Sequence, residues 1–138
     1  MSNEQIHQLP SLFYQLYKRL NQQLERDWKL DVSHIQFIAL GYIYDHKQVP
    51  MKDLAAYLAI TPASTSTMVK KLEAQGYLTR QEDAQDRRIF RLVLTDAGRA
   101  IYDACLDEAR QQLETMLDHL SITEKTQLTS ILTKMLAE

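Results

Sequence analysis

Apolar residues at the start of the chain recur at the spacing of one helix face. Steps of four and three residues between them predict a helix from about residue 9 to residue 28, with one side suited to packing. Pro10 suits the first turn of this helix, so the residues before it are expected to form a short arm. The apolar positions are Leu9, Phe13, Leu16, Leu20 and Leu24.

Capping and breaking residues mark the next three helices. Ser33 and Gln36 have the spacing of a capping box, which predicts a helix over residues 33–45. Pro50 interrupts the chain before a predicted helix over residues 51–58. Thr61 followed by Pro62 then predicts the capped start of another helix. This helix is expected to run to Gln75 and to end at Gly76, because glycine can take a left-handed turn.

The middle of the chain changes to a pattern typical of strands. Residues 77–80 and 89–94 are rich in β-forming side chains, and the second segment alternates in polarity, so a hairpin is expected. The eight residues between them, 81–88, are polar and charged and predict an exposed tip. Thr95 then caps a predicted helix to about Leu117, and a second capping-box spacing, Ser121 to Glu124, starts a final helix.

Composition favours one domain over residues 1–138 and argues against an enzyme. The chain has 138 residues, 45% of them hydrophobic, and only three glycines. It contains no phosphate-binding glycine loop and no Gly-x-Ser-x-Gly elbow, so neither catalysis nor a cofactor is expected. Because the sequence shows no secretory signal and no long apolar run, a cytoplasmic protein is expected.

Cysteine and histidine give no sign of a redox or metal site. Cys105 falls on the apolar face of a predicted helix and is interpreted as a packing residue. The four histidines are scattered, with no His-x-x-x-His pair, so metal binding is not expected; they are His7, His34, His46 and His119.

Charge is distributed unevenly along the chain. The formal net charge is −2, but residues 61–100 hold seven lysines and arginines against five acidic residues, a net of +2. Residues 101–138 hold three against seven, a net of −4. A mildly acidic protein with this distribution can still present a basic face to nucleic acid.

The order of elements is that of a winged helix-turn-helix, which places one helix in the major groove of DNA. The predicted fold is mainly α with a small β-hairpin wing. Helical spacing places Thr65, Met68, Val69 and Leu72 on the inner side of the helix that begins at Pro62. Its other side carries small hydroxyl and cationic side chains, which can approach base edges and phosphates. The candidate DNA-binding residues are Thr61, Ala63, Ser64, Ser66, Thr67, Lys70 and Lys71, with Asp86, Arg87 and Arg88 on the hairpin tip.

Several of these segments together resemble the multiple-antibiotic-resistance regulator (MarR) family. They are Leu54-Ala55, ITPASTSTMVKKLEAQGYL at residues 60–78, Asp86-Arg87-Arg88, and LTDAG at residues 94–98. The resemblance covers about residues 30–100 and implies a ligand-responsive repressor that binds pseudo-palindromic DNA as a homodimer. Arg88 resembles the family's minor-groove arginine and Asp86 the carboxylate that holds it. Thr67 stands where relatives often carry a basic residue, so base contacts cannot be transferred.

The resemblance also implies roles for the flanking helices. A winged core over residues 31–98 would be joined by dimerisation helices at residues 1–30 and 99–138, and a small aromatic or phenolic effector would bind nearby. Tyr14, Tyr17, His34 and Phe37 are candidate ligand-binding residues, although aromatic residues at helical spacing more often belong to a core and His34 could instead face solvent. The alternative function is a winged-helix protein-interaction module or anti-repressor without DNA binding.

Overall fold

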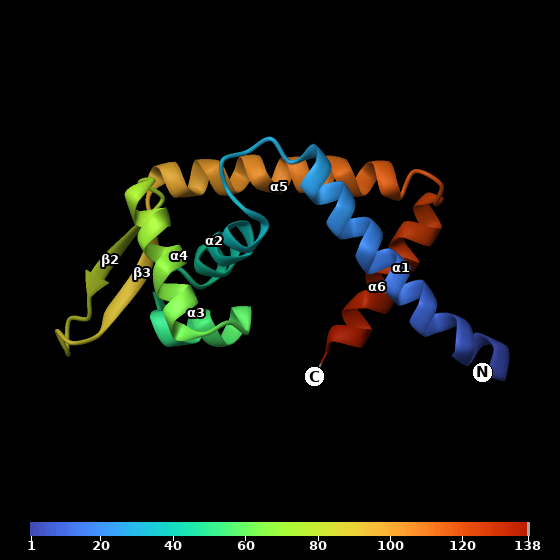
Figure 1. The fold of residues 1–138 in the computed structure, drawn as a ribbon, viewed down its shortest axis with the longest axis horizontal. Helices are drawn as coiled ribbons and strands as arrows, with labels where there is room; N and C mark the ends of the chain where they lie inside the picture. The colour runs from blue at the N-terminus through green and yellow to red at the C-terminus, as the bar shows by residue number, and fades with distance from the viewer. Residues whose placement is uncertain (138) are drawn as a thin grey trace. The chain divides into compact units, whose positions relative to one another are not determined.

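The computed structural model describes the backbone of residues 1–137 and the side chains of residues 1–23 and 28–137. The chain divides into two compact units, residues 28–107 and residues 1–27 with 108–138, which are described in turn. The first unit contains the predicted winged core. Figure 1 shows the elements, which are α1 (Asn3–Asp27), α2 (His34–His46), β1 (Val49–Pro50), α3 (Met51–Leu58), α4 (Pro62–Ala74), β2 (Leu78–Glu82), β3 (Phe90–Leu94), α5 (Asp96–Met116) and α6 (Ile122–Leu136).

Helix α2 begins at the predicted capping box. The Ser33 hydroxyl accepts a hydrogen bond from the Gln36 amide at 3.3 Å, and the Gln36 side chain accepts one from the Ser33 amide at 2.9 Å. Both backbone donors at the helix start are therefore satisfied locally. On the inner side of α2, Leu40 is fully buried and Phe37 packs at the edge of the core.

Helices α3 and α4 are joined by a tight turn. Ala59 ends α3 in the left-handed conformation at φ 53°, which is unusual for a residue with a Cβ. Thr61 caps α4 by accepting the Ser64 amide at 3.1 Å, and the proline follows at the first helical position. Gly76 ends the segment with φ 83°, so both predicted ends of α4 are confirmed.

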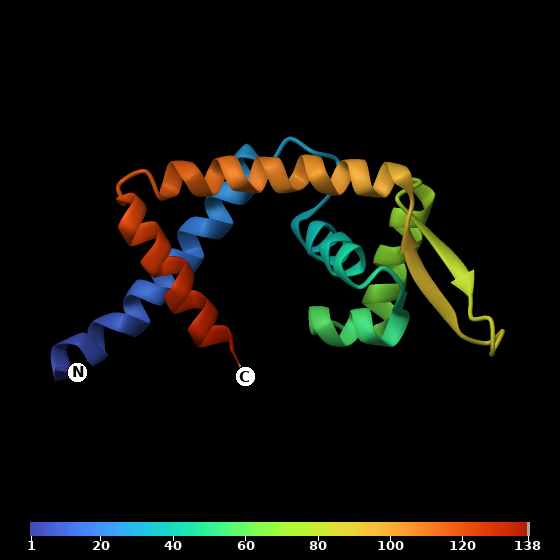
Figure 2. The ribbon, with the colours of Figure 1, turned by 180° about the vertical axis from the view of Figure 1, so that it is seen from behind.

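Three antiparallel strands form a small sheet in the order β1-β3-β2. The hairpin of β2 and β3 was predicted, but β2 extends to Glu82 and pairs it with Phe90, so Gln81 and Glu82 belong to the strand and not to the tip. Strand β1 was missed because Pro50 was interpreted only as a helix breaker. A proline is tolerated there because β1 lies at the sheet edge. Figure 2 shows the hairpin from behind, projecting past α4.

The core of this unit lies between α2, α3, α4 and the sheet. The predicted inner side of α4 is confirmed, since Thr65, Met68, Val69 and Leu72 are all buried. The buried Thr65 hydroxyl donates to the Thr61 carbonyl at 2.9 Å and so is not left unpaired. The other buried apolar side chains include Leu40, Ile43, Val49, Leu54, Leu78, Leu92, Leu94 and Cys105.

The start of α5 is fixed against the hairpin. The Thr95 hydroxyl accepts the Gly98 amide at 3.0 Å and donates to the Gly76 carbonyl, so the predicted cap is confirmed. A Cβ at Gly98 would lie 2.1 Å from the Tyr77 carbonyl oxygen. Only glycine fits this close approach between α5 and the turn that precedes β2.

The second unit holds α1, the end of α5 and α6. The capping box at Ser121 and Glu124 is confirmed at the start of α6. The expected N-terminal arm was wrong, because α1 begins at Asn3 and includes Pro10. A capping box that had been overlooked starts it: the Ser2 hydroxyl accepts the Gln5 amide at 3.3 Å, and the Gln5 side chain accepts the Ser2 amide at 3.1 Å. The side chain of Leu24, the last residue of the predicted apolar face, lies outside the described residues.

Candidate nucleic-acid interface

The outer side of α4 presents short polar and cationic side chains. Ala63, Ser64, Thr67, Lys70 and Lys71 are exposed, as expected for a surface that contacts a partner. Ser66 is only half-buried, between this side and the core. Helical spacing therefore placed the exposed face correctly, with Ser66 at its margin.

Hydrogen bonds within α4 determine what its hydroxyls can offer. Thr61 accepts the Ser64 amide and donates to the Ser64 hydroxyl oxygen at 2.9 Å, so it serves the helix as its cap. The Ser64 proton is left available for an acceptor outside the helix. The Thr67 hydroxyl donates to the Ala63 carbonyl at 3.1 Å, which leaves its lone pairs and its methyl group for the outside.

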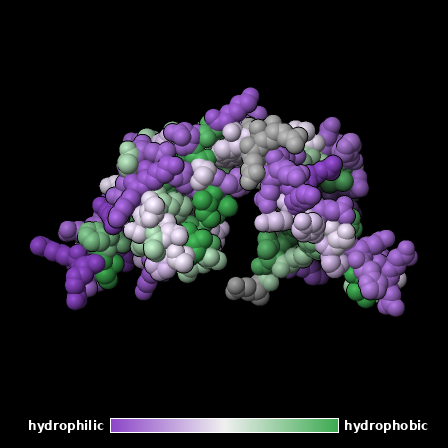
Figure 3. Space-filling model, in the orientation of Figure 1, coloured by the Kyte–Doolittle hydropathy of each residue, from purple (hydrophilic) through white to green (hydrophobic). Residues whose placement is uncertain are grey.

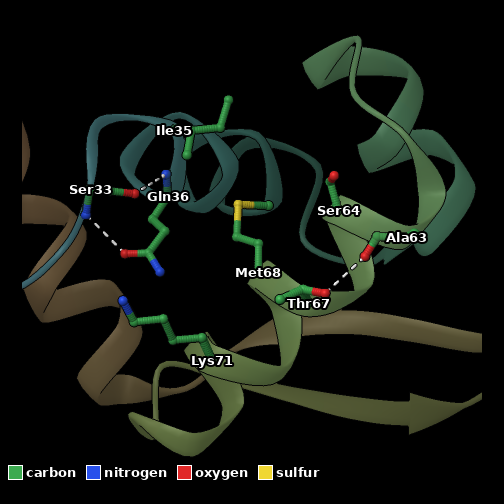
Figure 4. Close-up of a pocket in the computed structure, with 8 residues that line it drawn as sticks. All are labelled: Ser33, Ile35, Gln36, Ala63, Ser64, Thr67, Met68 and Lys71. Atoms are coloured by element: carbon green, nitrogen blue, oxygen red, sulfur yellow. Dashed lines mark hydrogen bonds between the residues drawn. The ribbon is translucent and has the colours of Figure 1, made fainter.

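A shallow hollow of about 470 Å³ lies between α4 and the first turn of α2. Figure 4 shows the Lys71 side chain extending from α4 toward Ser33, which caps α2, and Gln36 in the first turn of α2. Ile35 completes the α2 side of the hollow. The sequence placed the start of α2 but gave no sign that it lies beside the outer face of α4, because that proximity is a tertiary contact.

The hairpin tip holds an ion pair that orients Arg88. The Asp86 carboxylate accepts Nε of Arg88 at 3.1 Å, a terminal guanidinium nitrogen at 3.3 Å and the Arg88 amide at 3.1 Å. These hydrogen bonds, the side-chain one first, lower the pKa of Asp86 from its ordinary value. The Arg88 side chain is 90% exposed, so it is held by one partner while open to solvent. Figure 3 shows the hydrophilic colour of this tip.

A second ion pair lies at the base of the tip and was not predicted. The Asp83 carboxylate accepts the Gln85 amide at 2.8 Å, the Asp86 amide at 3.2 Å and Nε of Arg91 at 3.0 Å. These bonds, led by that from Gln85, lower the pKa of Asp83. The spacing of Asp83 and Gln85 is that of an Asx turn, a signal present in the sequence.

The four candidate ligand-binding residues divide between the two units. Tyr14 and Tyr17 are exposed on α1. His34 and Phe37 lie together on α2 beside Trp28, which the sequence had not singled out, with ring centroids 5.4 Å and 5.6 Å from it. The buried Nε2 of His34 has no hydrogen-bond partner among the described residues. This ring therefore packs among aromatic side chains and does not simply face solvent.

Cys105 is a core residue. Its side chain is fully buried, and burial raises the pKa of its thiol to about 11. Within the part of the chain that the structure describes, no three His, Cys, Asp or Glu side chains gather as a metal site would require. No described helix is long and apolar enough to cross a membrane.

A short helix, a tight turn, an exposed second helix and a three-stranded sheet with a projecting hairpin define a winged helix-turn-helix protein. The family model for the MarR family matches residues 30–89. The HTH-type transcriptional repressor NicR of Pseudomonas putida is 30% identical over 133 residues, 96% of this chain and 83% of that protein. The HTH-type transcriptional regulator YwhA of Bacillus subtilis is 26% identical over 104 residues, 75% of each chain.

Solved structures have the same fold. A MarR family protein from Bacillus stearothermophilus matches with a TM-score of 0.86 at 20% identity, covering 98% of this chain and 95% of that one. A mutant MarR from E. coli complexed with operator DNA matches with a TM-score of 0.75 at 23% identity, covering 96% of each chain. The chain belongs to the MarR family of winged helix-turn-helix transcriptional regulators.

Proposed function

We propose that this protein is a repressor that binds a pseudo-palindromic operator as a homodimer, with α4 in the major groove and the hairpin tip in the adjacent minor groove. The observation that carries the proposal is the exposed Arg88 guanidinium, which Asp86 holds in the same compact unit as the small-residue face of α4. A narrow minor groove concentrates negative potential, and an arginine already held in place loses less freedom on insertion. The solved E. coli MarR complex with operator DNA has the same fold.

Each candidate residue then has a distinct role in DNA binding. Ser64 and Thr67 face base edges, with Ala63 allowing close approach. Lys70, Lys71 and Arg87 neutralise phosphates, and Ser66 contacts the backbone at the margin of the face. Thr61 acts by capping α4, because both functions of its hydroxyl are used within the helix.

Exposed apolar side chains in the second unit support the homodimer. On α1, Leu9, Leu12, Phe13 and Leu16 are each at least 41% exposed and lie on one side by helical spacing. On α6, Ile131, Leu132 and Met135 are also exposed. A second copy of the chain would cover such apolar faces, since self-complementary pairs are the commonest protein assembly.

The aromatic cluster on α2 supports an effector site for a small aromatic or phenolic acid. Trp28 and Phe37 offer ring faces, and Nε2 of His34, which has no hydrogen-bond partner among the described residues, offers a hydrogen bond to a hydroxyl or carboxylate. A ligand that binds one conformation of the dimer better would shift its affinity for DNA. Thermal unfolding with and without salicylate, a simple phenolic acid, tests for this site: a higher midpoint supports it, and an unchanged midpoint across a panel of phenolic acids would refute it.

We place the protein in the cytoplasm, where its operator would be.

Selection of duplexes from a random pool tests the function directly. Several rounds of binding and sequencing are expected to enrich two inverted half-sites spaced by about one helical turn, 10–10.5 base pairs, because the protein's two-fold axis is repeated in its site. Enrichment of no sequence would contradict DNA recognition and favour a protein-interaction module. Enrichment of an isolated half-site would contradict the proposed homodimer but not DNA recognition.

A further inference from the structure

Asp83 occupies the centre of a hydrogen-bond network at the base of the hairpin tip. One carboxylate oxygen accepts the amides of Gln85 and Asp86, and the other accepts the guanidinium of Arg91. The Asp83 side chain is only 17% exposed, compared with 90% for Arg88. Asp83 is thus the more enclosed of the two charged residues and is unsuited to reaching a partner itself.

Backbone hydrogen bonds connect the same residues of the hairpin tip. The Asp83 amide donates to the Ile89 carbonyl at 2.9 Å, and the Ile89 amide donates to the Asp86 carbonyl at 3.0 Å. Asp86 is therefore held through its amide by Asp83 and through its carbonyl by Ile89, while its carboxylate holds Arg88. The direction of the Arg88 side chain depends on where this network places Asp86.

Arg91 anchors the network to the sheet. It lies in β3, the central strand, and its Cα is paired with Pro50 on one side and Gln81 on the other. Because both neighbouring strands hold the backbone of Arg91, its guanidinium ties Asp83 to the central strand of the sheet. Asp83 and Arg91 were not among the residues expected to act in DNA binding.

We propose that Asp83 and Arg91 form a positioning pair that sets the direction of Arg88 and so determines how much the hairpin contributes to DNA affinity. This inference depends on the proposed function, because it requires Arg88 to contact the duplex. Neither residue of the pair need touch DNA. Their effect passes through Asp86 to Arg88.

A double-mutant cycle on the selected duplex tests the pair. Fluorescence anisotropy gives the dissociation constants of the wild-type protein, Asp83→Ala, Arg88→Ala and the double variant. Asp83→Ala is expected to bind roughly ten-fold more weakly and Arg88→Ala roughly ten-fold to a hundred-fold more weakly, with the double variant no weaker than Arg88→Ala alone. Gln85→Ala, a control that keeps the backbone amide bonded to Asp83, is expected to bind like wild type.

Two further measurements separate positioning from a general loss of structure. Asp83→Asn keeps an oxygen for the two amides but loses the charge opposite Arg91, so its affinity is expected to lie between wild type and Asp83→Ala. The salt dependence of binding for Asp83→Ala is expected to match that of Arg88→Ala, with a slope lower than wild type by roughly one for each protomer of the dimer. Thermal unfolding of each variant establishes that it is folded under the binding conditions.

The outcomes distinguish this inference from the function on which it rests. Wild-type affinity for Asp83→Ala, or losses that multiply in the double variant, would overturn the positioning pair while leaving DNA binding intact. If the losses of affinity for Arg91→Ala and Arg88→Ala multiply in the double variant, Arg91 contacts phosphate directly and the positioning pair is overturned. Wild-type affinity for Arg88→Ala would overturn both the minor-groove role and the positioning pair.

Discussion

Arg88 combines high exposure with a fixed direction. Its guanidinium makes two hydrogen bonds to Asp86 and otherwise faces solvent. An ion pair this exposed adds little to folding stability, because water screens the charges. We therefore expect changes at Arg88 to affect the proposed DNA binding far more than unfolding.

Replacement of Arg88 by alanine tests that division. Arg88→Ala is expected to weaken binding to the selected duplex by roughly ten-fold to a hundred-fold, with the thermal midpoint almost unchanged. Gel-shift titration and thermal unfolding measure the two effects. Arg99→Ala removes the same charge from an exposed position on α5 and is the matched control, expected to bind nearly normally. An equal loss for both variants would show that only net charge matters.

Unlike the exposed Arg88, Cys105 is a buried side chain that serves only the packing of the core. With a pKa of about 11, roughly one thiol in a thousand is ionised at pH 8, so a thiol reagent should react with the native protein very slowly. Reaction should become fast in denaturant. Because the pKa is raised in the folded state, the free energy of unfolding is expected to fall as pH rises above about 8.5, the ordinary value for an unfolded thiol. Rapid labelling of native protein would contradict this account and reopen a redox role.

Local signals account for most of the elements. Capping at Ser33, Thr61 and Ser121 could be predicted because each cap is built by residues within four positions of one another. The predicted start of α1 is wrong although its capping box, Ser2 to Gln5, is equally local, because a proline such as Pro10 also suits the first turn of a helix. Strand β1 could not be predicted from its own two residues, since it exists only through its pairing with β3.

In the candidate interface too, the sequence predicts the local features but not those that depend on tertiary contacts. Helical spacing identified the exposed side of α4, and the Asp86-Arg88 pair lies two residues apart in the sequence. Asp83 and Arg91 are eight residues apart, and only the hairpin register brings them together. The hollow between α4 and α2 depends on packing between helices and had no sequence signal.

The turn between α3 and α4 offers a test of stability at the scale of one element. Ala59 has φ 53°, where glycine has no Cβ penalty, so Ala59→Gly is expected to raise the free energy of unfolding by about 0.5–1 kcal/mol. Ala56→Gly, the same substitution at an exposed position inside α3, is the control and should lower it by about 1 kcal/mol. Denaturant titration measures both. Destabilisation by Ala59→Gly would contradict the left-handed cap.

At the scale of the whole molecule, the exposed apolar face of α1 is expected to form part of the dimer. Phe13→Glu places a charge on that face and should shift the protein toward monomer, because an unpaired charge is costly to bury in an interface. Ser11→Glu adds the same charge on the opposite side of α1, by helical spacing, and should leave the dimer intact. Sedimentation velocity gives the masses. A Phe13→Glu dimer as stable as wild type would place the interface elsewhere.

The salt dependence of wild-type binding to the selected duplex tests the central claim most directly. If α4 and the hairpin tip of each protomer neutralise phosphates in two half-sites, affinity should fall by roughly a thousand-fold or more between 50 and 200 mM salt, because bound counterions are released on association. A linear plot of log affinity against log salt with a steep negative slope is the predicted result. Absent binding in dilute buffer, or an affinity that does not change with salt, would contradict the claim that this surface binds DNA.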